Sequence, residues 1–365
     1  MVKARSAPDV TMLLCTLMLL GIGVVMVYSA SAVLAFHEFG DYYYYLKRQL
    51  LFAVLGVVAM FITMNVDYWV WKKYAKIGLI VCFILLIAVL IPGIGVVRGG
   101  ARSWLGIASF GIQPSEFMKI GMILYLSKML SEQQNKITLF TKGLLPPLGL
   151  VGLAFGLIML QPDLGTGVVL VGATLLIIYT SGARMLHLSS LGLLGLAGFV
   201  GLIAAAPYRL QRITAFLDPW QDPLGAGYQS IQSLYAIGPG GLVGLGLGMS
   251  RQKYSYLPEP QTDFIFSIIA EELGFIGGSF ILILFMLLVW RGMRTAITAP
   301  DTFGSLLATG IVGMIAVQVI INIGVVIGMF PVTGITLPLI SAGGSSLTLM
   351  LTSLGILLNI SRYAR

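Results

Sequence analysis

Residues 251–278, RQKYSYLPEPQTDFIFSIIAEELGFIGG, decide how this chain is interpreted, because a polar segment there runs directly into an apolar one. Asp263 stands at the junction and is followed by Phe264, Ile265 and Phe266. We therefore expect Asp263 in the first turn of a membrane helix, at the level where water gives way to lipid. An ionisable residue at that level is a candidate functional residue.

The composition places the whole chain in a membrane. Hydrophobic residues make up 58% of its 365 residues and charged residues only 10%, whereas charged residues make up about 25% of a soluble domain. Spans of about 20 residues each leave room for about ten helices. We predict an all-α integral membrane protein, with about ten transmembrane helices in one bundle and a single polytopic domain over residues 1–365. Cys15 and Cys82 lie in apolar runs and predict neither a disulfide nor a metal site.

The apolar runs are separated by short loops, with one exception. The first run, residues 11–34, is too long for the apolar part of a signal peptide, so we expect an uncleaved helix. Later runs lie at about residues 50–65, 77–92, 114–130, 263–290 and 303–330, with three more between 143 and 206 and a last one ending at Arg362. The exception is residues 207–262, which predict a long extracytoplasmic loop between spans seven and eight.

Basic residues in the short loops predict the orientation, because such residues collect on the cytoplasmic side. The richer side holds Lys3, Arg5, Lys72, Lys73, Lys76, Lys128, Lys136, Lys142, Arg184, Arg291, Arg294, Arg362 and Arg365, and the other holds Lys47, Arg48, Arg98 and Arg102. Both termini are then cytoplasmic. The net charge of +8 therefore reflects membrane topology, and no nucleic-acid partner is expected.

Four charged residues are expected at one membrane depth near the outer face. Glu116 and Lys119 belong to the first turn of span four, Asp163 to the start of span six, and Asp263 to the start of span eight. Such a group favours a polar cavity that binds a charged substrate. The alternative is a buried set of ion pairs, Lys119 with Asp163 or Glu116, that only fixes the bundle.

Further candidates lie in the loops that face outward. Arg102 and Trp104 precede span four, where the tryptophan could stack on a sugar and the arginine could hold a phosphate, or the pair could simply anchor the chain at the interface. Arg209, Arg212, Arg251 and Lys253 form a basic group in the long loop that would suit an anionic ligand. The alternative for this group is a solvated loop surface.

Two acidic residues deeper in span eight need a separate interpretation. At about 100° per residue, Glu271 falls near the Asp263 face of a helix and Glu272 on the opposite face. Glu271 alone could extend the cavity, and we favour a structural role for both. The glycine-rich run GPGGLVGLGLG, residues 238–248, is not a dinucleotide fingerprint, because it lacks the strand and helix that such a motif connects.

These motifs together resemble the SEDS family (shape, elongation, division and sporulation), which includes FtsW, RodA and SpoVE. The resemblance is carried by PSEFMK, QPDLGTG, PEPQTDFIF with EELGFIGG, and PVTGITLP with GGSS, in this order along nearly the whole chain. The string SRQKYSYLPEPQTDFIF is most similar to the sporulation branch. Ala342 departs from the tyrosine that division-type members often carry at this position.

The resemblance implies ten helices and a peptidoglycan glycosyltransferase that polymerises lipid II outside the bacterial cytoplasmic membrane, with a role in the spore cortex. It also implies a class B penicillin-binding protein as partner, bound through that protein's transmembrane helix. Asp263 would be the essential acid, with Lys119, Glu116, Asp163, Trp104 and Arg102 near the cavity.

Chemistry supplies a compatible mechanism. Displacement of an α-linked diphosphate by a sugar 4-hydroxyl inverts the anomeric carbon and needs a base on the hydroxyl, for which we predict Asp263. It also needs cations on the diphosphate, for which we predict Lys119 with Arg102, Arg212 or Arg251. No cofactor is required. A divalent cation, Mg²⁺ or Mn²⁺, could bridge the diphosphate, although no ligand cluster in the sequence demands one.

Two other functions remain open at this stage. A lipid II flippase would move the substrate without bond chemistry, but transporters place their polar residues and broken helices near the bilayer midplane. A scaffold would only recruit the penicillin-binding protein, and it would tolerate substitutions at Lys119 and Asp163.

Overall fold

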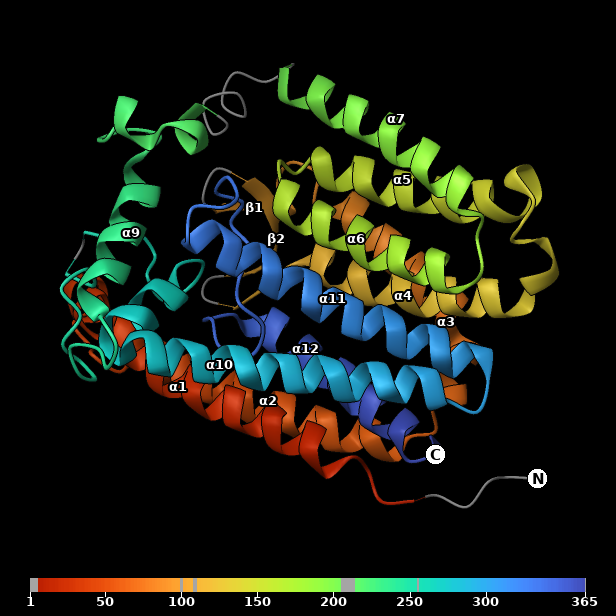
Figure 1. Cartoon of the computed structure of the whole chain (residues 1–365), viewed down its shortest axis with the longest axis horizontal. Helices are drawn as coiled ribbons and strands as arrows, with labels where there is room; N and C mark the ends of the chain where they lie inside the picture. The colour runs from red at the N-terminus through yellow and green to blue at the C-terminus, as the bar shows by residue number, and fades with distance from the viewer. Residues whose placement is uncertain (1–5, 99–100, 108–109, 205–213, 255, 365) are drawn as a thin grey trace.

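The computed structural model describes residues 6–98, 101–107, 110–204, 214–254 and 256–364. Figure 1 shows an elongated bundle in which most long helices run side by side along the longest axis. Over these residues the chain is mainly helical, as the composition predicts. The longer helices are α1 (Val10–Phe39), α2 (Tyr44–Asn65), α3 (Tyr68–Ala88), α4 (Pro114–Glu132), α5 (Leu145–Met159), α6 (Leu164–Thr180), α7 (Met185–Ala204), α9 (Tyr228–Gly240), α10 (Ile265–Thr298), α11 (Thr302–Val326) and α12 (Gly344–Ser361).

Among the described residues, six segments are long and apolar enough to cross a membrane. They are α1, α2, residues Phe140–Met159, α10, α11 and α12, and the shorter apolar helix α6 (Leu164–Thr180) adds to them. A multi-pass membrane protein is therefore confirmed, whereas ten spans and the loop over residues 207–262 stay predictions. Within that loop the described residues form a 3-10 turn (Pro219–Gln221) and α9.

Helices α11 and α12 form the centre of the bundle. Within their most apolar windows, 72% of the residues are buried, against 28–44% for the other candidate spans. The outer helices expose their apolar side chains, as expected where lipid replaces water. Helix α7, green in Figure 1, lies at the edge of the bundle beside α5 and α6.

Both ends of the chain lie at one end of the bundle. The Ser6 amide and hydroxyl both donate to the Arg362 carbonyl, at 2.9 and 2.7 Å. In Figure 1 the two termini are on the right, opposite α9. The termini therefore share one side of the membrane, and the cytoplasmic identity of that side stays a prediction.

The segment before α4, predicted above only as a loop that holds Arg102 and Trp104, is a small sheet. Strands β1 (Gly95–Arg98), β2 (Ala101–Ile107) and β3 (Phe110–Ile112) pair antiparallel in the order β1-β2-β3. A register shift between Val96 and Val97 marks a bulge, with Trp104 opposite Val96 and Arg102 opposite Val97. The sheet leads directly into the start of α4.

Helix α10 is broken at Gly274, where the prediction has one continuous span from Asp263 to Trp290. Gly274 has φ 66° and ψ −165°, values that do not belong to a helix. The chain is kinked there, and the kink brings Gly278 beside Phe266, since a Cβ at Gly278 would lie 3.5 Å from the Phe266 ring. Residues 265–273 therefore form a separate half-helix that carries Asp263 at its start.

The glycine-rich run 238–248 supplies hydrogen-bond partners to the backbone groups at this break. The amides of Leu245 and Gly246 donate to the carbonyls of Glu271 and Glu272, at 2.9 and 3.0 Å. The amides of Phe275 and Ile276 donate in return to the carbonyls of Gly241 and Leu242, at 2.9 and 3.0 Å. Backbone groups released by a helix break at membrane depth need such partners.

Candidate functional site

The starts of α4 and α6 are joined by Asp163. Its carboxylate caps α6 by accepting from the Thr166 amide at 3.0 Å, as an N-cap aspartate does. The same carboxylate accepts from the Gln113 side-chain amide at 3.0 Å and from the Ser115 hydroxyl at 3.4 Å. Asp163 is therefore paired with neutral donors, and its predicted alternative partner Lys119 bonds elsewhere.

Asp263 lies in the turn just before α10, two residues ahead of the first helical residue Ile265. Its carboxylate is next to Gly334, since a Cβ there would lie 3.6 Å from Oδ2 of Asp263. The Asn322 side-chain amide donates both to the Asp263 carbonyl at 2.8 Å and to the Ile335 carbonyl at 2.7 Å. Asn322 of α11 thus ties the Asp263 turn to residues 333–335.

Residues 333–335 also contact the start of α6. A Cβ at Gly165 would lie 2.6 Å from the Thr333 carbonyl. The segment therefore contacts the start of α6 through Thr333 and the Asp263 carboxylate through Gly334, and it belongs to the PVTGITLP motif. The Thr333 hydroxyl is buried and makes no hydrogen bond among the residues that the structure describes. A buried hydroxyl left open in the residue next to Gly334 is a candidate ligand contact.

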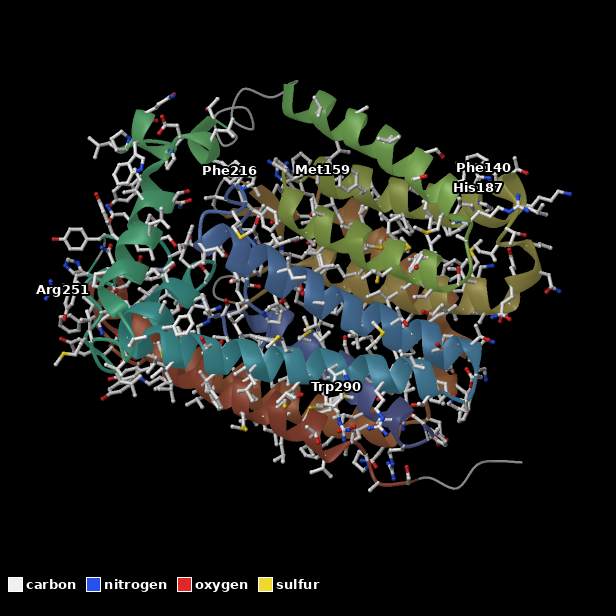
Figure 2. The ribbon with its side chains drawn as sticks, in the orientation of Figure 1. Phe140, Met159, His187, Phe216, Arg251 and Trp290 are labelled. Carbon is white, nitrogen blue, oxygen red and sulfur yellow. The ribbon has the colours of Figure 1, made fainter. Side chains whose placement is uncertain are left out.

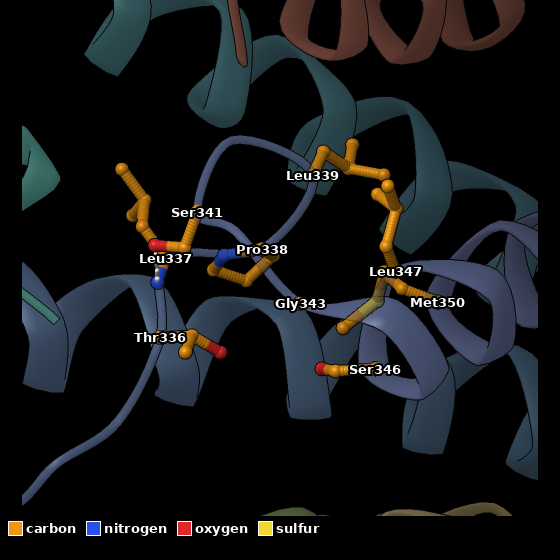
Figure 3. Close-up of a pocket in the computed structure, with 9 residues that line it drawn as sticks. All are labelled: Thr336, Leu337, Pro338, Leu339, Ser341, Gly343, Ser346, Leu347 and Met350. Carbon is orange, nitrogen blue, oxygen red and sulfur yellow. Dashed lines mark hydrogen bonds between the residues drawn. The ribbon is translucent and has the colours of Figure 1, made fainter. Parts of the chain in front are cut away.

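The rest of this segment is held rigidly. Figure 3 shows the Ser341 hydroxyl accepting from the Leu337 amide, at 2.8 Å. The same hydroxyl donates to the Thr262 carbonyl at 2.6 Å, next to Asp263. The pocket drawn in Figure 3 has a volume of about 10 Å³, room for about one water. A ligand larger than a water molecule therefore has to approach from a more open face.

Lys119 and Glu116 form a buried ion pair on α4. Lys119 Nζ lies 2.8 Å from Glu116 Oε1, and the two residues are 1% and 8% exposed. Of the two partners predicted for Lys119, the structure selects Glu116. The pair carries no net charge, which fits a role in fixing α4 beside the sheet as well as a role in substrate binding.

Lys119→Met is expected to destabilise the fold by about 3–5 kcal/mol, because it leaves the Glu116 carboxylate buried without its cation. The double variant Lys119→Met/Glu116→Leu is expected to recover most of that loss, since no charge then stays buried. Thermal unfolding in detergent measures both. A single variant as stable as the parent would contradict the importance of the pair.

The basic residues predicted to bind an anionic ligand do not all lie near Asp263. Arg102 and Trp104 lie half-buried on β2, close to the start of α4. Arg212 and Arg209 lie outside the described residues. Arg251 is exposed at the α9 end of the molecule, and Figure 2 shows its side chain at the outer edge, away from the bundle.

Glu271 and Glu272 are fully buried and bond to the preceding loop. Glu271 accepts from the Ser250 hydroxyl at 2.5 Å and from the Arg251 amide at 2.9 Å. Glu272 accepts from Ser29 of α1 at 2.6 Å and pairs with Lys253 Nζ at 3.3 Å. These contacts give both residues the structural role that we favoured, and they place Lys253 inside the protein, where a solvated or ligand-binding cation was expected.

Sequence reasoning missed Gln113, Asn322 and Thr333. Gln113 directly precedes PSEFMK and Thr333 lies within PVTGITLP, so both motifs held a signal. Asn322 lies inside an apolar run, and a polar residue within a membrane helix is itself a signal.

Comparison with known proteins gives full-length matches. Residues 10–365 match the model of a family described as cell cycle protein, which covers FtsW, RodA and SpoVE. The chain is 61% identical to the stage V sporulation protein E of Bacillus subtilis over 365 residues, all of both chains. It is 46% identical to the probable peptidoglycan glycosyltransferase FtsW of Trichlorobacter lovleyi, over 97% of this chain and 93% of that protein.

Solved structures agree with these matches. A chain of a peptidoglycan synthase complex, described as coordinating polymerization and crosslinking, superposes with a TM-score of 0.80 at 32% identity, covering 98% of both chains. The rod shape determining protein RodA of Thermus thermophilus superposes with a TM-score of 0.72 at 29% identity, over 98% of this chain and 97% of that one.

Proposed function

Because this chain belongs to the FtsW, RodA and SpoVE family of cell cycle proteins, we propose that it is a peptidoglycan glycosyltransferase of the cell membrane. The observation that carries this conclusion is the match of nearly its whole length to relatives with that activity in their names. The 61% identity to a sporulation protein supports a role in the spore cortex.

The proposed substrate is lipid II, on the outer side of the cytoplasmic membrane. The acceptor's 4-hydroxyl oxygen bonds to the anomeric carbon of the donor sugar as the bond from that carbon to the diphosphate oxygen breaks. The diphosphate leaves with the electron pair, and the hydroxyl proton passes to Asp263. A single displacement of this kind converts an α-linkage into a β-linkage.

Asp263 is suited to the role of base by its position. The Asn322 amide and the Ser341 hydroxyl fix the backbone on either side of it, so its carboxylate is presented from a rigid turn beside Gly334. A catalytic group that is already oriented contributes more to rate than a mobile one. Asp163 and the Thr333 hydroxyl, across the same segment, are the proposed contacts for sugar hydroxyls.

Cations for the leaving diphosphate are proposed from the sheet and α4. Arg102 is half-buried on β2, and its planar guanidinium suits phosphate oxygens. Lys119 is neutralised by Glu116, so its contribution depends on the substrate drawing it away from that carboxylate. Arg212 remains a proposal from the sequence.

A divalent cation is a weaker proposal. Over the described part of the chain, no three His, Cys, Asp or Glu side chains come together as a metal site. An Mg²⁺ or Mn²⁺ ion would therefore be held mainly by the diphosphate itself, with no more than two such side chains from the described part of the chain.

The proposed partner is a class B penicillin-binding protein. The solved chain with a TM-score of 0.80 comes from a complex that couples polymerization to crosslinking, and this fold is the one that complex uses. We propose that the partner binds through its transmembrane helix, and that both termini of the present chain are cytoplasmic.

A lipid II flippase is the second candidate, and one observation favours it. The break of α10 at Gly274 is a feature that transporters share. Here, however, four backbone hydrogen bonds join residues 241–246 to the two sides of the break. Such a fixed break argues against the moving helix that a flippase would need.

Lipid II polymerisation by the purified chain tests the proposal, with and without its candidate partner. Polymer on a gel is expected in the presence of the partner. Translocation of lipid II across liposomes without any polymer would favour the flippase.

A further inference from the structure

An open hollow at the α9 end of the molecule lies outside the site described above. It is lined by Arg251, Gln252, Tyr254 and Tyr256 and has a volume of about 510 Å³. Tyr254 and Tyr256 are each 56% exposed, and Figure 2 shows Arg251 at the outer edge of the protein. Ser255, between the tyrosines, lies outside the described residues.

Buried neighbours hold the hollow in shape. Lys253 and Leu257, 6% and 1% exposed, point inward from the same turn. Lys253 Nζ donates to the Gly248 carbonyl at 2.6 Å and pairs with Glu272. The Leu257 amide donates to the Gln252 carbonyl at 3.0 Å. Because these inward anchors fix the turn, the rings of Tyr254 and Tyr256 are presented outward.

The lining has the chemistry of a carbohydrate site. Exposed tyrosine rings offer an apolar face and a hydroxyl, a combination that suits the faces and edges of a sugar ring. Gln252 is half-buried in the lining of the hollow, and its side-chain amide can exchange hydrogen bonds with the hydroxyl or acetamido groups of a sugar. Arg251 adds a cation for an acidic substituent.

We propose that this hollow binds the newly made glycan strand, a chain of N-acetylated sugars that carry acidic peptides. The inference rests on the proposed glycosyltransferase function and adds a product site to it. Asp263 follows Tyr256 by seven residues, a reach of at most about 25 Å. One strand can therefore lie against the tyrosines while its end is extended near Asp263. A strand held there stays attached between additions, so the hollow favours long products.

Equilibrium binding of labelled strands tests the hollow without turnover. Uncrosslinked glycan strands, made from lipid II by an unrelated polymerase, are titrated against the detergent-purified chain by fluorescence anisotropy. Tyr254→Ala/Tyr256→Ala is expected to weaken binding about tenfold or more, because two stacking contacts are lost. Tyr179→Ala is the matched control, since Tyr179 is 52% exposed at the end of α6, and it is expected to bind like the parent.

A second variant distinguishes the contribution of the sugars to binding from that of the peptides. Arg251→Glu is expected to weaken binding of strands that carry peptides and to leave binding of amidase-stripped strands unchanged. In polymerisation assays the double tyrosine variant is expected to make shorter strands than the Tyr179→Ala control. If the parent polymerises lipid II but binds strands no more tightly than the double tyrosine variant, the proposed product site is wrong and the proposed glycosyltransferase function still stands. A parent that binds strands but never consumes lipid II would overturn the proposed function.

Discussion

Asp263→Asn, purified with its partner, is expected to polymerise lipid II about 10²- to 10⁴-fold more slowly than the parent, the usual contribution of a general base. Asparagine keeps the size of the side chain but cannot accept the hydroxyl proton. The loss is expected in kcat, because the backbone bonds from Asn322 and Ser341 to this turn involve carbonyls that the substitution leaves in place.

The matched control is Asp218→Asn. Asp218 also lies in segment 207–262, which is predicted to be extracytoplasmic. Its carboxylate accepts from the Trp220 amide at 3.2 Å, a bond that asparagine can replace. This variant is expected to keep the parent rate. If Asp263→Asn also polymerised lipid II at the parent rate, Asp263 would not be the base.

Gly274→Ala is expected to lower both the unfolding temperature and the polymerisation rate, the latter by more than tenfold. Gly274 adopts φ 66° and ψ −165°, a conformation that costs a residue with a Cβ about 1–3 kcal/mol. The new methyl group would also lie 2.7 Å from the Leu242 carbonyl and would press on the Gly244 amide. The glycine-rich loop would have to move, and the half-helix that begins just after Asp263 would lose its backbone partners.

Gly278→Ala provides the comparison for this effect. A Cβ at Gly278 has an ordinary contact of 3.5 Å with the Phe266 ring, so this variant is expected to fold and polymerise like the parent. Unfolding followed by intrinsic fluorescence in detergent, together with the polymerisation assay, measures both variants. Equal stability of the two would show that the break at Gly274 is not a fixed feature.

Composition and helical patterning were sufficient to predict a multi-pass helical protein, because lipid contact imposes long apolar runs whatever the tertiary structure. The break at Gly274 could not be predicted in this way. EELGFIGG is compatible with a continuous membrane helix, and only the pairing with residues 241–246 makes the break stable. The prediction that Glu271 falls near the Asp263 face of a helix also fails, because Asp263 lies before the first helical residue, Ile265.

The sequence was sufficient to identify candidate residues of the site, but not to predict which of them pair with one another. Sequence position places Glu116, Lys119, Asp163 and Asp263 near the starts of helices, but it left Lys119 free to pair with either Glu116 or Asp163. Packing in three dimensions selects Glu116 for Lys119 and leaves Asp163 to Gln113 and Ser115. The small sheet was missed because its strands are short and rich in glycine.

The contact of the Ser29 hydroxyl with Glu272 has a consequence for biosynthesis. The two residues are 243 positions apart, so α1 enters the bilayer long before its polar partner has been translated. The same delay applies to α2, whose Gly56 packs against Leu351 of α12. The ribosome must release α10 before the Ser29 surface of α1 is covered, and α12 before the Gly56 surface of α2 is covered. Chains truncated before Gly344 would consequently expose an unfilled seam to membrane proteases.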